Sequence, residues 1–226
     1  MEKLFENLFL YEIVLLFLGV FLFMILCSAL VYYVLKKEDI KKLLYFFTVP
    51  IIMIAYPSIQ EIQIENDKLA IVKYQNEVKN NPDDDKAKEQ LAEVTVKLEK
   101  RASTPADMAV ISESYLLLEK PEKAISFANK AINIDKKEMD TKPPSDGTTP
   151  VKDLKDNKIV ENRVKTLQGI KEMASIQKDI KIDSTLLKDS VRLKLRIQKV
   201  ETINPSTKQY FNQKYTTRKL STTNKN

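Results

Sequence analysis

The sequence contains no histidine and no tryptophan, and only one cysteine and three glycines. Histidine is the commonest general base and the commonest metal ligand in proteins, so its absence removes the usual basis of both kinds of site. A single cysteine excludes an internal disulfide. So few glycines favour long helices over a fold rich in sheets or turns. These absences point to a helical protein without enzyme activity.

Motifs for chemistry are also missing. The sequence has no glycine-rich phosphate loop, and its one acidic cluster, "NPDDDK" at residues 81–86, lacks the glycine and the distal glutamate of a calcium loop. Acidic residues at such a place more simply begin a helix, whose N-terminus attracts negative charge. We therefore expect no enzyme activity, no cofactor, no metal and no small-molecule substrate.

The first long hydrophobic run, residues 13–35, carries no charge. As a helix it would be about 34 Å long, enough to cross a hydrocarbon core of roughly 30 Å. Tyrosines lie at both ends, where aromatic rings favour the membrane interface. The sequence thus predicts a transmembrane helix after an N-terminal flank, residues 1–12.

Two other interpretations of this run are disfavoured. A cleaved signal peptide would begin with a basic segment, whereas Glu2 and Glu6 here outnumber Lys3. A lipoprotein signal ending at Cys27 would need a small residue before the cysteine, and Leu26 is not small. We expect Cys27 to be a small apolar residue within the span.

A second run, residues 43–59, is at the lower length limit for a span. Pro50 within it removes a backbone hydrogen bond, so we expect a kinked helix. A re-entrant or interfacial helix is the alternative. Because only residues 36–42 separate the two runs, the sequence predicts an antiparallel transmembrane hairpin.

The distribution of lysine predicts the orientation of this hairpin. The connection has four lysines, more than either flank: Lys36, Lys37, Lys41 and Lys42, against Lys3 on one side and Lys68 and Lys73 on the other. The positive-inside rule places the connection in the cytoplasm and both termini outside. In a bacterium the rest of the chain would then be periplasmic, anchored in the inner membrane. A cytoplasmic-facing domain is the alternative.

Residues 60–137 have helical spacing throughout. Asp84 and Asp85, the pair Thr104 and Pro105, and Pro121 are each typical of a helix start. We expect four helices, over residues 62–80, 85–101, 105–119 and 121–135.

The last two of these helices resemble the tetratricopeptide repeat, a helical hairpin with small residues where its helices cross. The repeat positions are occupied by Met108, Ile111, Tyr115, Ala124, Ala128 and Ala131. A weaker trace lies upstream at Ala70 and Tyr74. Ala70 and Ala124 are 124 − 70 = 54 residues apart, whereas a regular array repeats every 34 residues or so. The resemblance covers residues 104–137 well and 62–82 weakly, and it implies a short, irregular stack.

Proteins of this repeat family bind other proteins through the face of the first helix of each hairpin. The resemblance therefore implies that Ala109, Glu113 and Leu116 face a partner. Family members that bind a terminal carboxylate use lysine and asparagine on this face. This sequence has alanine and glutamate there instead.

The last third begins with a linker rich in turn residues, 138–152, followed by a helical segment, 153–203. Residues 183–203 fit a helix face or an alternating strand, and the helix is favoured. Residues 204–226 are polar and basic, and we expect a disordered tail. If this tail binds anything, its basic residues would contact anionic lipid headgroups: Lys208, Lys214, Arg218 and Lys219. Nucleic acid is not expected outside the cell membrane.

The sequence thus predicts an all-α protein: a transmembrane helical hairpin, a tetratricopeptide-like domain and a further helical segment. The expected function is a non-enzymatic, membrane-anchored scaffold that assembles other protein subunits of an envelope complex. The alternatives are a cytoplasmic-facing adaptor for soluble or anionic partners, and a small accessory subunit of a channel or transporter.

Overall fold

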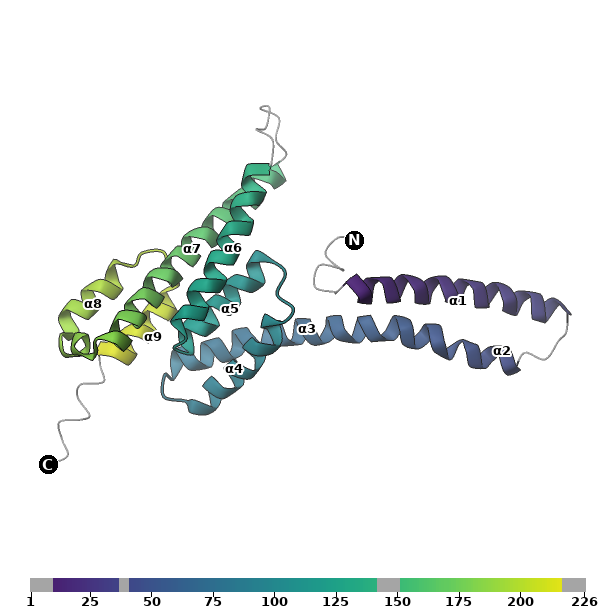
Figure 1. Ribbon diagram of the computed structural model, residues 1–226, viewed down its shortest axis with the longest axis horizontal. Coiled ribbons are helices and arrows are strands. Elements are labelled where there is room, and N and C mark those ends of the chain that lie inside the picture. Colours follow the sequence, from purple (N-terminus) through teal and green to yellow (C-terminus); the bar gives the residue numbers. More distant parts are fainter. Residues whose placement is uncertain (1–9, 37–40, 142–150, 217–226) are drawn as a thin grey trace. The chain divides into compact units, whose positions relative to one another are not determined.

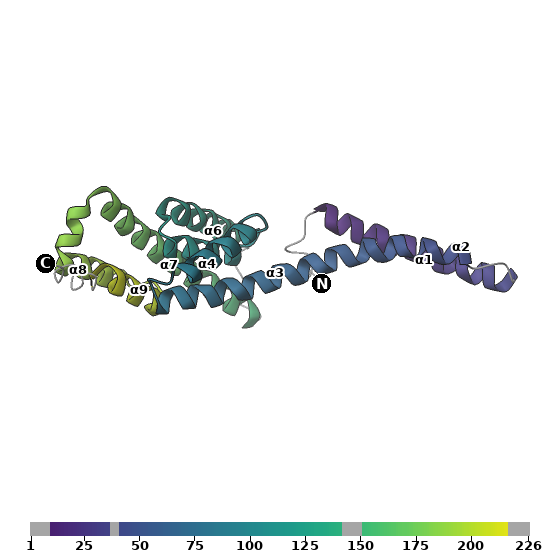
Figure 2. The ribbon, with the colours of Figure 1, turned by 90° about the horizontal axis from the view of Figure 1, so that it is seen from below.

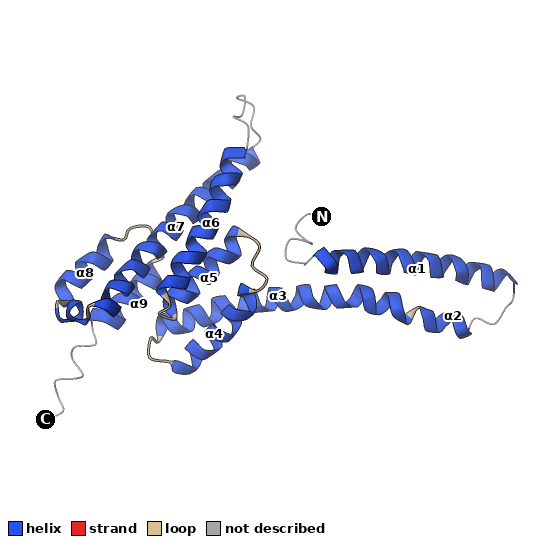
Figure 3. Cartoon of the chain, viewed as in Figure 1, coloured by secondary structure: helices blue, strands red, loops and turns tan. Residues whose placement is uncertain are grey.

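The computed structural model describes residues 10–36, 41–141 and 151–216. All regular structure in these ranges is helical, and they contain no strand, so the all-α expectation is confirmed (Figure 3). The elements are α1 (Leu10–Lys36), α2 (Lys41–Phe46), α3 (Thr48–Asn80), α4 (Asp85–Glu99), α5 (Pro105–Leu117), α6 (Pro121–Thr141), α7 (Val151–Ile182), the 3₁₀ helix η2 (Ser184–Lys188), α8 (Ser190–Lys199) and α9 (Pro205–Thr216).

The chain forms two compact units, Met1–Asp67 and Lys68–Asn226. The boundary falls inside α3, which is one continuous helix. The sequence had predicted a span over residues 43–59 and a separate helix from residue 62, and the break between them is wrong. Helix-forming residues fill the interval, so nothing there stops the helix.

In unit one, α1 packs closely against α3 at Gly19. A Cβ atom at this position would lie 3.0 Å from Ile54 Cγ1 and 3.0 Å from Met53 Cβ. A glycine allows this approach, as small residues do between helices in membranes. Phe23 and Phe47 add an edge-to-face contact with ring centroids 5.6 Å apart.

Two helices of the described chain are long and apolar enough to cross a membrane, Leu10–Lys36 and the helical stretch Leu43–Asn80. We expected a kink at Pro50, but the helix is interrupted elsewhere. The interruption lies at Phe47, between α2 and α3, and Pro50 stands in the first turn of α3. A proline is tolerated there, because a first-turn N–H has no partner within the helix. Pro57 is the proline inside α3.

The helix starts in unit two follow the predicted caps. The Asp84 side chain accepts a hydrogen bond from the Ala87 backbone N–H (3.0 Å), and the Thr104 hydroxyl accepts one from that of Asp107 (3.1 Å). Each bond satisfies an N–H that the helix leaves without a partner. Pro105 and Pro121 are the first residues of α5 and α6.

A tight turn joins α5 to α6. Glu119 has a left-handed backbone conformation, with φ of 58°, and the Lys120 N–H donates to the Tyr115 carbonyl (2.9 Å). This bond ends α5 in the manner of a Schellman motif. The turn makes α5 and α6 an antiparallel hairpin, and α7 packs against both helices (Figure 1).

The core of unit two is apolar and draws on nearly all of its helices. Ala124, Ala128 and Ala131 on α6 are completely buried. The Ser112 hydroxyl donates to the Ala124 carbonyl (2.7 Å), so the two helices are close at this alanine. The largest fully buried side chains are Ile71, Leu91, Ile111, Tyr115, Leu116, Leu117, Leu167, Ile170, Met173, Leu193, Tyr210 and Phe211.

The last third differs from the expected bounds at its linker and at its tail. The expected linker, 138–152, overlaps α6, which continues to Thr141, and α7, which begins at Val151; residues 142–150 lie outside the described residues. Residues 184–188 and 190–199 are helical, so the helix was the right choice over the strand. The expected disordered tail is wrong for Pro205–Thr216, which form α9. This helix is stable because Tyr210 and Phe211 are completely buried.

Gly169 on α7 lies against the backbone that leads into α9. A Cβ atom here would lie 2.9 Å from Ile203 N and 2.9 Å from the carbonyl carbon of Thr202. Replacing glycine by alanine in a helix normally stabilises it by about 1 kcal/mol. Here the clash outweighs that gain, because overpacking typically costs about 1–3 kcal/mol.

We therefore expect Gly169→Ala to lower the free energy of unfolding, measured by urea titration of the detergent-solubilised chain with circular dichroism. Gln168→Ala, at the exposed neighbouring position, is the matched control and should change it little. A Gly169→Ala protein more stable than the parent would contradict the close approach.

Candidate functional site

The residues that resemble repeat positions lie mostly in the core. Ile111, Tyr115 and the three alanines of α6 are buried, whereas Met108, Ala70 and Tyr74 are half-buried. The structure therefore brings the α5 and α6 residues together. Ala70 and Tyr74 lie on the separate helix α3.

Tyr115 connects three helices. Its ring stacks on Phe127 of α6, with centroids 5.8 Å apart and an interplanar angle of 28°. Its hydroxyl donates to the carboxylate of Glu99 on α4. Lys123 of α6 donates to the same carboxylate (3.2 Å) and to the Tyr115 hydroxyl (3.2 Å). Tyr115 thus fixes α4 to the α5–α6 hairpin.

The environment of this cluster shifts three pKa values. Burial acts to raise the pKa of Glu99, but the hydrogen bonds from Tyr115 and Lys123 together hold it below its ordinary value. Burial, followed by the hydrogen bond to Glu99, raises the pKa of Tyr115. Hydrogen bonds to Tyr115 and Glu99 raise the pKa of Lys123. All three pKa shifts favour the charge states that hold the cluster together: an ionised Glu99, a neutral Tyr115 and a protonated Lys123. We therefore interpret the cluster as a structural contact between helices.

Two of the three positions expected to face a partner are covered by the chain itself. Leu116 is completely buried, and its carbonyl accepts a hydrogen bond from the Gln177 amide (3.1 Å). Glu113 Oε1 accepts from Lys79 Nζ of α3 (2.9 Å) and from the Thr207 hydroxyl of α9 (2.5 Å). Ala109 is half-buried.

Helix α9 is held on this face by further hydrogen bonds. The Tyr210 hydroxyl donates to the Leu117 carbonyl (3.0 Å). Lys214 donates to the Glu119 carboxylate and to the Tyr210 hydroxyl. Figures 1 and 2 both show α9 beside the C-terminal end of α3, although the two segments begin and end unit two in sequence. Of the three positions that the resemblance assigned to a partner, Glu113 is thus in contact with α9.

The lysines expected to contact anionic groups serve the fold where the structure describes them. The Lys214 side chain is only 5% exposed and pairs with Glu119. Lys208 donates to the Gln198 (2.6 Å) and Val200 (2.9 Å) carbonyls, at the C-terminal end of α8. Arg218 and Lys219 lie outside the described residues.

Sequence reasoning missed two buried polar contacts between helices. Arg163 of α7 forms a bidentate ion pair with Asp135 of α6, whose carboxylate is completely buried. The Gln75 amide of α3 donates to the Val110 carbonyl (2.9 Å) and to the Ser114 hydroxyl (2.8 Å). A polar residue at an otherwise apolar helical position, such as Gln75, is the sequence signal from which these contacts could have been predicted.

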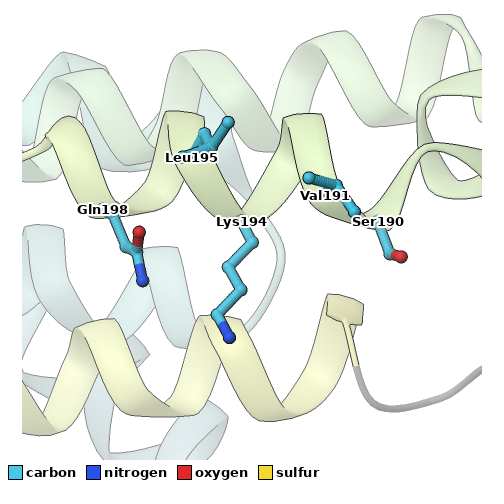
Figure 4. A pocket seen from close by; sticks show the side chains of 5 residues that line it. All are labelled: Ser190, Val191, Lys194, Leu195 and Gln198. Carbon is cyan, nitrogen blue, oxygen red and sulfur yellow. The ribbon is translucent and has the colours of Figure 1, made fainter.

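Two apolar side chains of α8 are exposed to solvent. Val191 and Leu195 are 70% and 54% exposed. Together with Ser190, Lys194 and Gln198 they line a shallow depression along one side of the helix (Figure 4). The opposite side of α8, with Leu193 and Ile197, is buried in unit two.

The part of the chain that the structure describes contains no group of three or more acidic or cysteine residues arranged to hold a metal ion. No protein-family model matches this chain, and neither a curated protein nor a solved structure matches it.

Proposed function

We propose that this chain is a non-enzymatic, membrane-anchored helical scaffold that assembles other protein subunits in an envelope complex. The observation that supports it best is the continuity of α3. Its first part carries exposed Ile51 and Ile52 in an apolar stretch, and its last part contributes buried Ile71 and Val78 to the core of unit two. One helix thus joins an apolar anchor to a folded domain.

The exposure of unit one supports the membrane anchor. A core helix of a soluble protein would bury its apolar side chains, whereas on α1 Phe17, Phe21 and Met24 are each more than 60% exposed. Large side chains exposed to water along a whole helix are unfavourable by about 25 cal/mol per Å² of apolar surface. Lipid is the environment that suits them.

The packing of α5 and α6 supports the repeat-like part of the proposal. Tyr115 lies on Phe127, and Ala124, Ala128 and Ala131 are buried where the helices are close. Helix α4 occupies most of the extra length in the 54-residue interval between Ala70 and Ala124. We infer one repeat-like hairpin within an irregular helical stack.

The proposed location is the bacterial inner membrane, with unit two on the periplasmic side. A cysteine introduced at Ser145 tests this in a background where Cys27 is replaced by alanine. We expect a membrane-impermeant maleimide to label Ser145→Cys in intact cells. Protection until the cells are permeabilised would contradict the periplasmic location and favour the cytoplasmic-facing adaptor.

Scaffold function predicts that assembly depends on unit two. Membranes with the full chain, or with a version that lacks residues 68–226, would be solubilised in mild detergent and run on native gels. We expect the full chain in an assembly much larger than its own 26.1 kDa plus detergent, and the truncated chain outside it.

The accessory-subunit alternative makes the opposite prediction. If the spans carry the function, the truncated chain should enter the same assembly as the full chain. That result, or a full chain that migrates alone, would contradict the scaffold proposal.

A further inference from the structure

Helix α3 carries a row of apolar side chains along one exposed side. In unit one, Ile52, Ile59 and Ile62 are 61%, 53% and 61% exposed, and Ala55 is half-buried. The spacing of these residues alternates between three and four, as in the heptad repeat of a coiled coil. The next position of the same spacing is Asn66, which is also exposed. We call these residues the α3 seam.

Neighbouring helices pack on the opposite side of α3. In unit one, α1 approaches α3 at Met53 and Ile54, and Ile64 is buried (Figures 1 and 2). In unit two, Ile71 and Val78 of α3 are completely buried. At about 100° per residue, all of these positions lie about 120° or more from the middle of the seam. The described helices therefore leave the seam open.

Lipid accounts for only part of this exposure. The seam begins in the apolar run that precedes Glu61, the first charged residue of α3. Ile62 lies beyond that charge, and Leu69, the next position of the spacing after Asn66, is 72% exposed in a polar stretch. Apolar side chains that continue in a row outside the apolar run favour a contact with protein.

We propose that two copies of this chain associate in parallel through the α3 seam. Copies anchored in one membrane with the same orientation hold their α3 helices parallel and at the same depth, so each seam residue meets its own counterpart. The change from apolar to charged residues at Glu61 then coincides in the two helices, which a helix of another protein would have to reproduce. The inference rests on the proposed membrane anchor, which aligns the copies.

The seam residues suit two strands. Ile52, Ile59 and Asn66 fall at the a positions of the heptad, and Ala55 and Ile62 fall at the d positions. Isoleucine at both a and d admits three strands, whereas one asparagine at an a position selects two strands in register. Among the described residues, none makes a side-chain hydrogen bond with Asn66 within one copy, so its amide is available to the same amide of the second copy.

Charge does not oppose this pairing. The seam itself is uncharged, and the flanking e and g positions between residues 56 and 72 include one charged residue, Glu65. In a parallel pair, Glu65 of one copy lies beside Ala70 of the other, so like charges do not meet. The a position after Asn66 is Lys73, which would meet its own counterpart, so the seam ends before it.

The length of the seam explains why the membrane matters. From Ile52 to Leu69 there are 69 − 52 = 17 residue steps, or about 26 Å of helix. Coiled coils recognised in soluble proteins usually extend over about three to four heptads or more, so this seam is short. A shared membrane confines both copies and raises their effective concentration, which supports association through a short seam.

Disulfide cross-linking in membranes tests the seam, using the full chain with Cys27 replaced by alanine. The seam variants are Ile62→Cys and Asn66→Cys. The matched control is Gln63→Cys, an exposed position at the same depth but beside the seam. The membranes are oxidised mildly, and non-reducing gels measure the dimer.

We expect most of the Ile62→Cys and Asn66→Cys chains to form a species of twice the mass. Gln63→Cys should do so much more slowly, because cysteines with Cα atoms more than about 7 Å apart cannot be bridged without backbone movement.

Co-purification of two differently tagged copies from mild detergent gives a second measure. Ile62→Glu should lower recovery of the second tag about tenfold or more, because each copy would bury an unpaired carboxylate. Gln63→Glu should leave recovery unchanged. Ile62 is exposed in a single copy, so both variants should keep the helical content of the parent by circular dichroism. Asn66→Val should add larger assemblies to the dimer, since the asparagine no longer selects two strands.

Equal cross-linking of Gln63→Cys and Ile62→Cys would overturn this inference, because it would indicate random collision. A membrane-integrated chain that stays single at both seam cysteines, or cross-links to a different protein, would overturn this inference and leave the anchor in place. A chain that alkaline carbonate releases from the membranes would overturn the anchor together with this inference.

Discussion

The buried ion pair between Lys79 and Glu113 holds together helices that are far apart in the sequence. Their side chains are 5% and 18% exposed, and the Thr207 hydroxyl donates to the same carboxylate oxygen that Lys79 reaches. Removal of one member would leave a charge with little water and no partner, which is strongly destabilising in protein interiors. This one carboxylate therefore fixes the end of α3 and the start of α9 to the middle of α5.

This contact holds α9 against α5, and it therefore affects which surfaces unit two can offer to a partner. On the α5 face that a repeat protein would offer to a partner, Glu113 accepts a hydrogen bond from Thr207 of α9. Tyr210 and Lys214 hold α9 at the C-terminal end of α5, through the Leu117 carbonyl and the Glu119 carboxylate. Unit two is in this sense a closed module. A protein of this design would meet other proteins through its outer surfaces.

Local signals in the sequence were sufficient for much of the fold. Thr104 with Pro105 and Pro121 predicted the starts of α5 and α6, because capping chemistry depends on neighbouring residues alone. The alanines of α6 predicted where helices come close. The break before residue 62 was wrong, because the change from apolar to polar composition alters the environment of α3 without ending the helix.

The C-terminal helix was missed because its stability comes from distant contacts. Residues 205–216 are polar and basic, which resembles a solvated tail, yet Tyr210 and Phe211 are buried and Lys214 pairs with Glu119. Whether a lysine is solvated or buried depends on the carboxylate that meets it, and that carboxylate lies 95 residues earlier. The aromatic pair was the only local sign of burial.

The most direct test of this account is amide hydrogen exchange of α9 in the intact, solubilised chain, in the parent and in Glu113→Gln. The account predicts that α9 exchanges as slowly as α5 in the parent, and that Glu113→Gln speeds exchange in α9 about tenfold or more, since loss of a charged hydrogen-bond partner costs about 1.5–3 kcal/mol. Exchange of α9 in the parent at the rate of an unfolded peptide would contradict it.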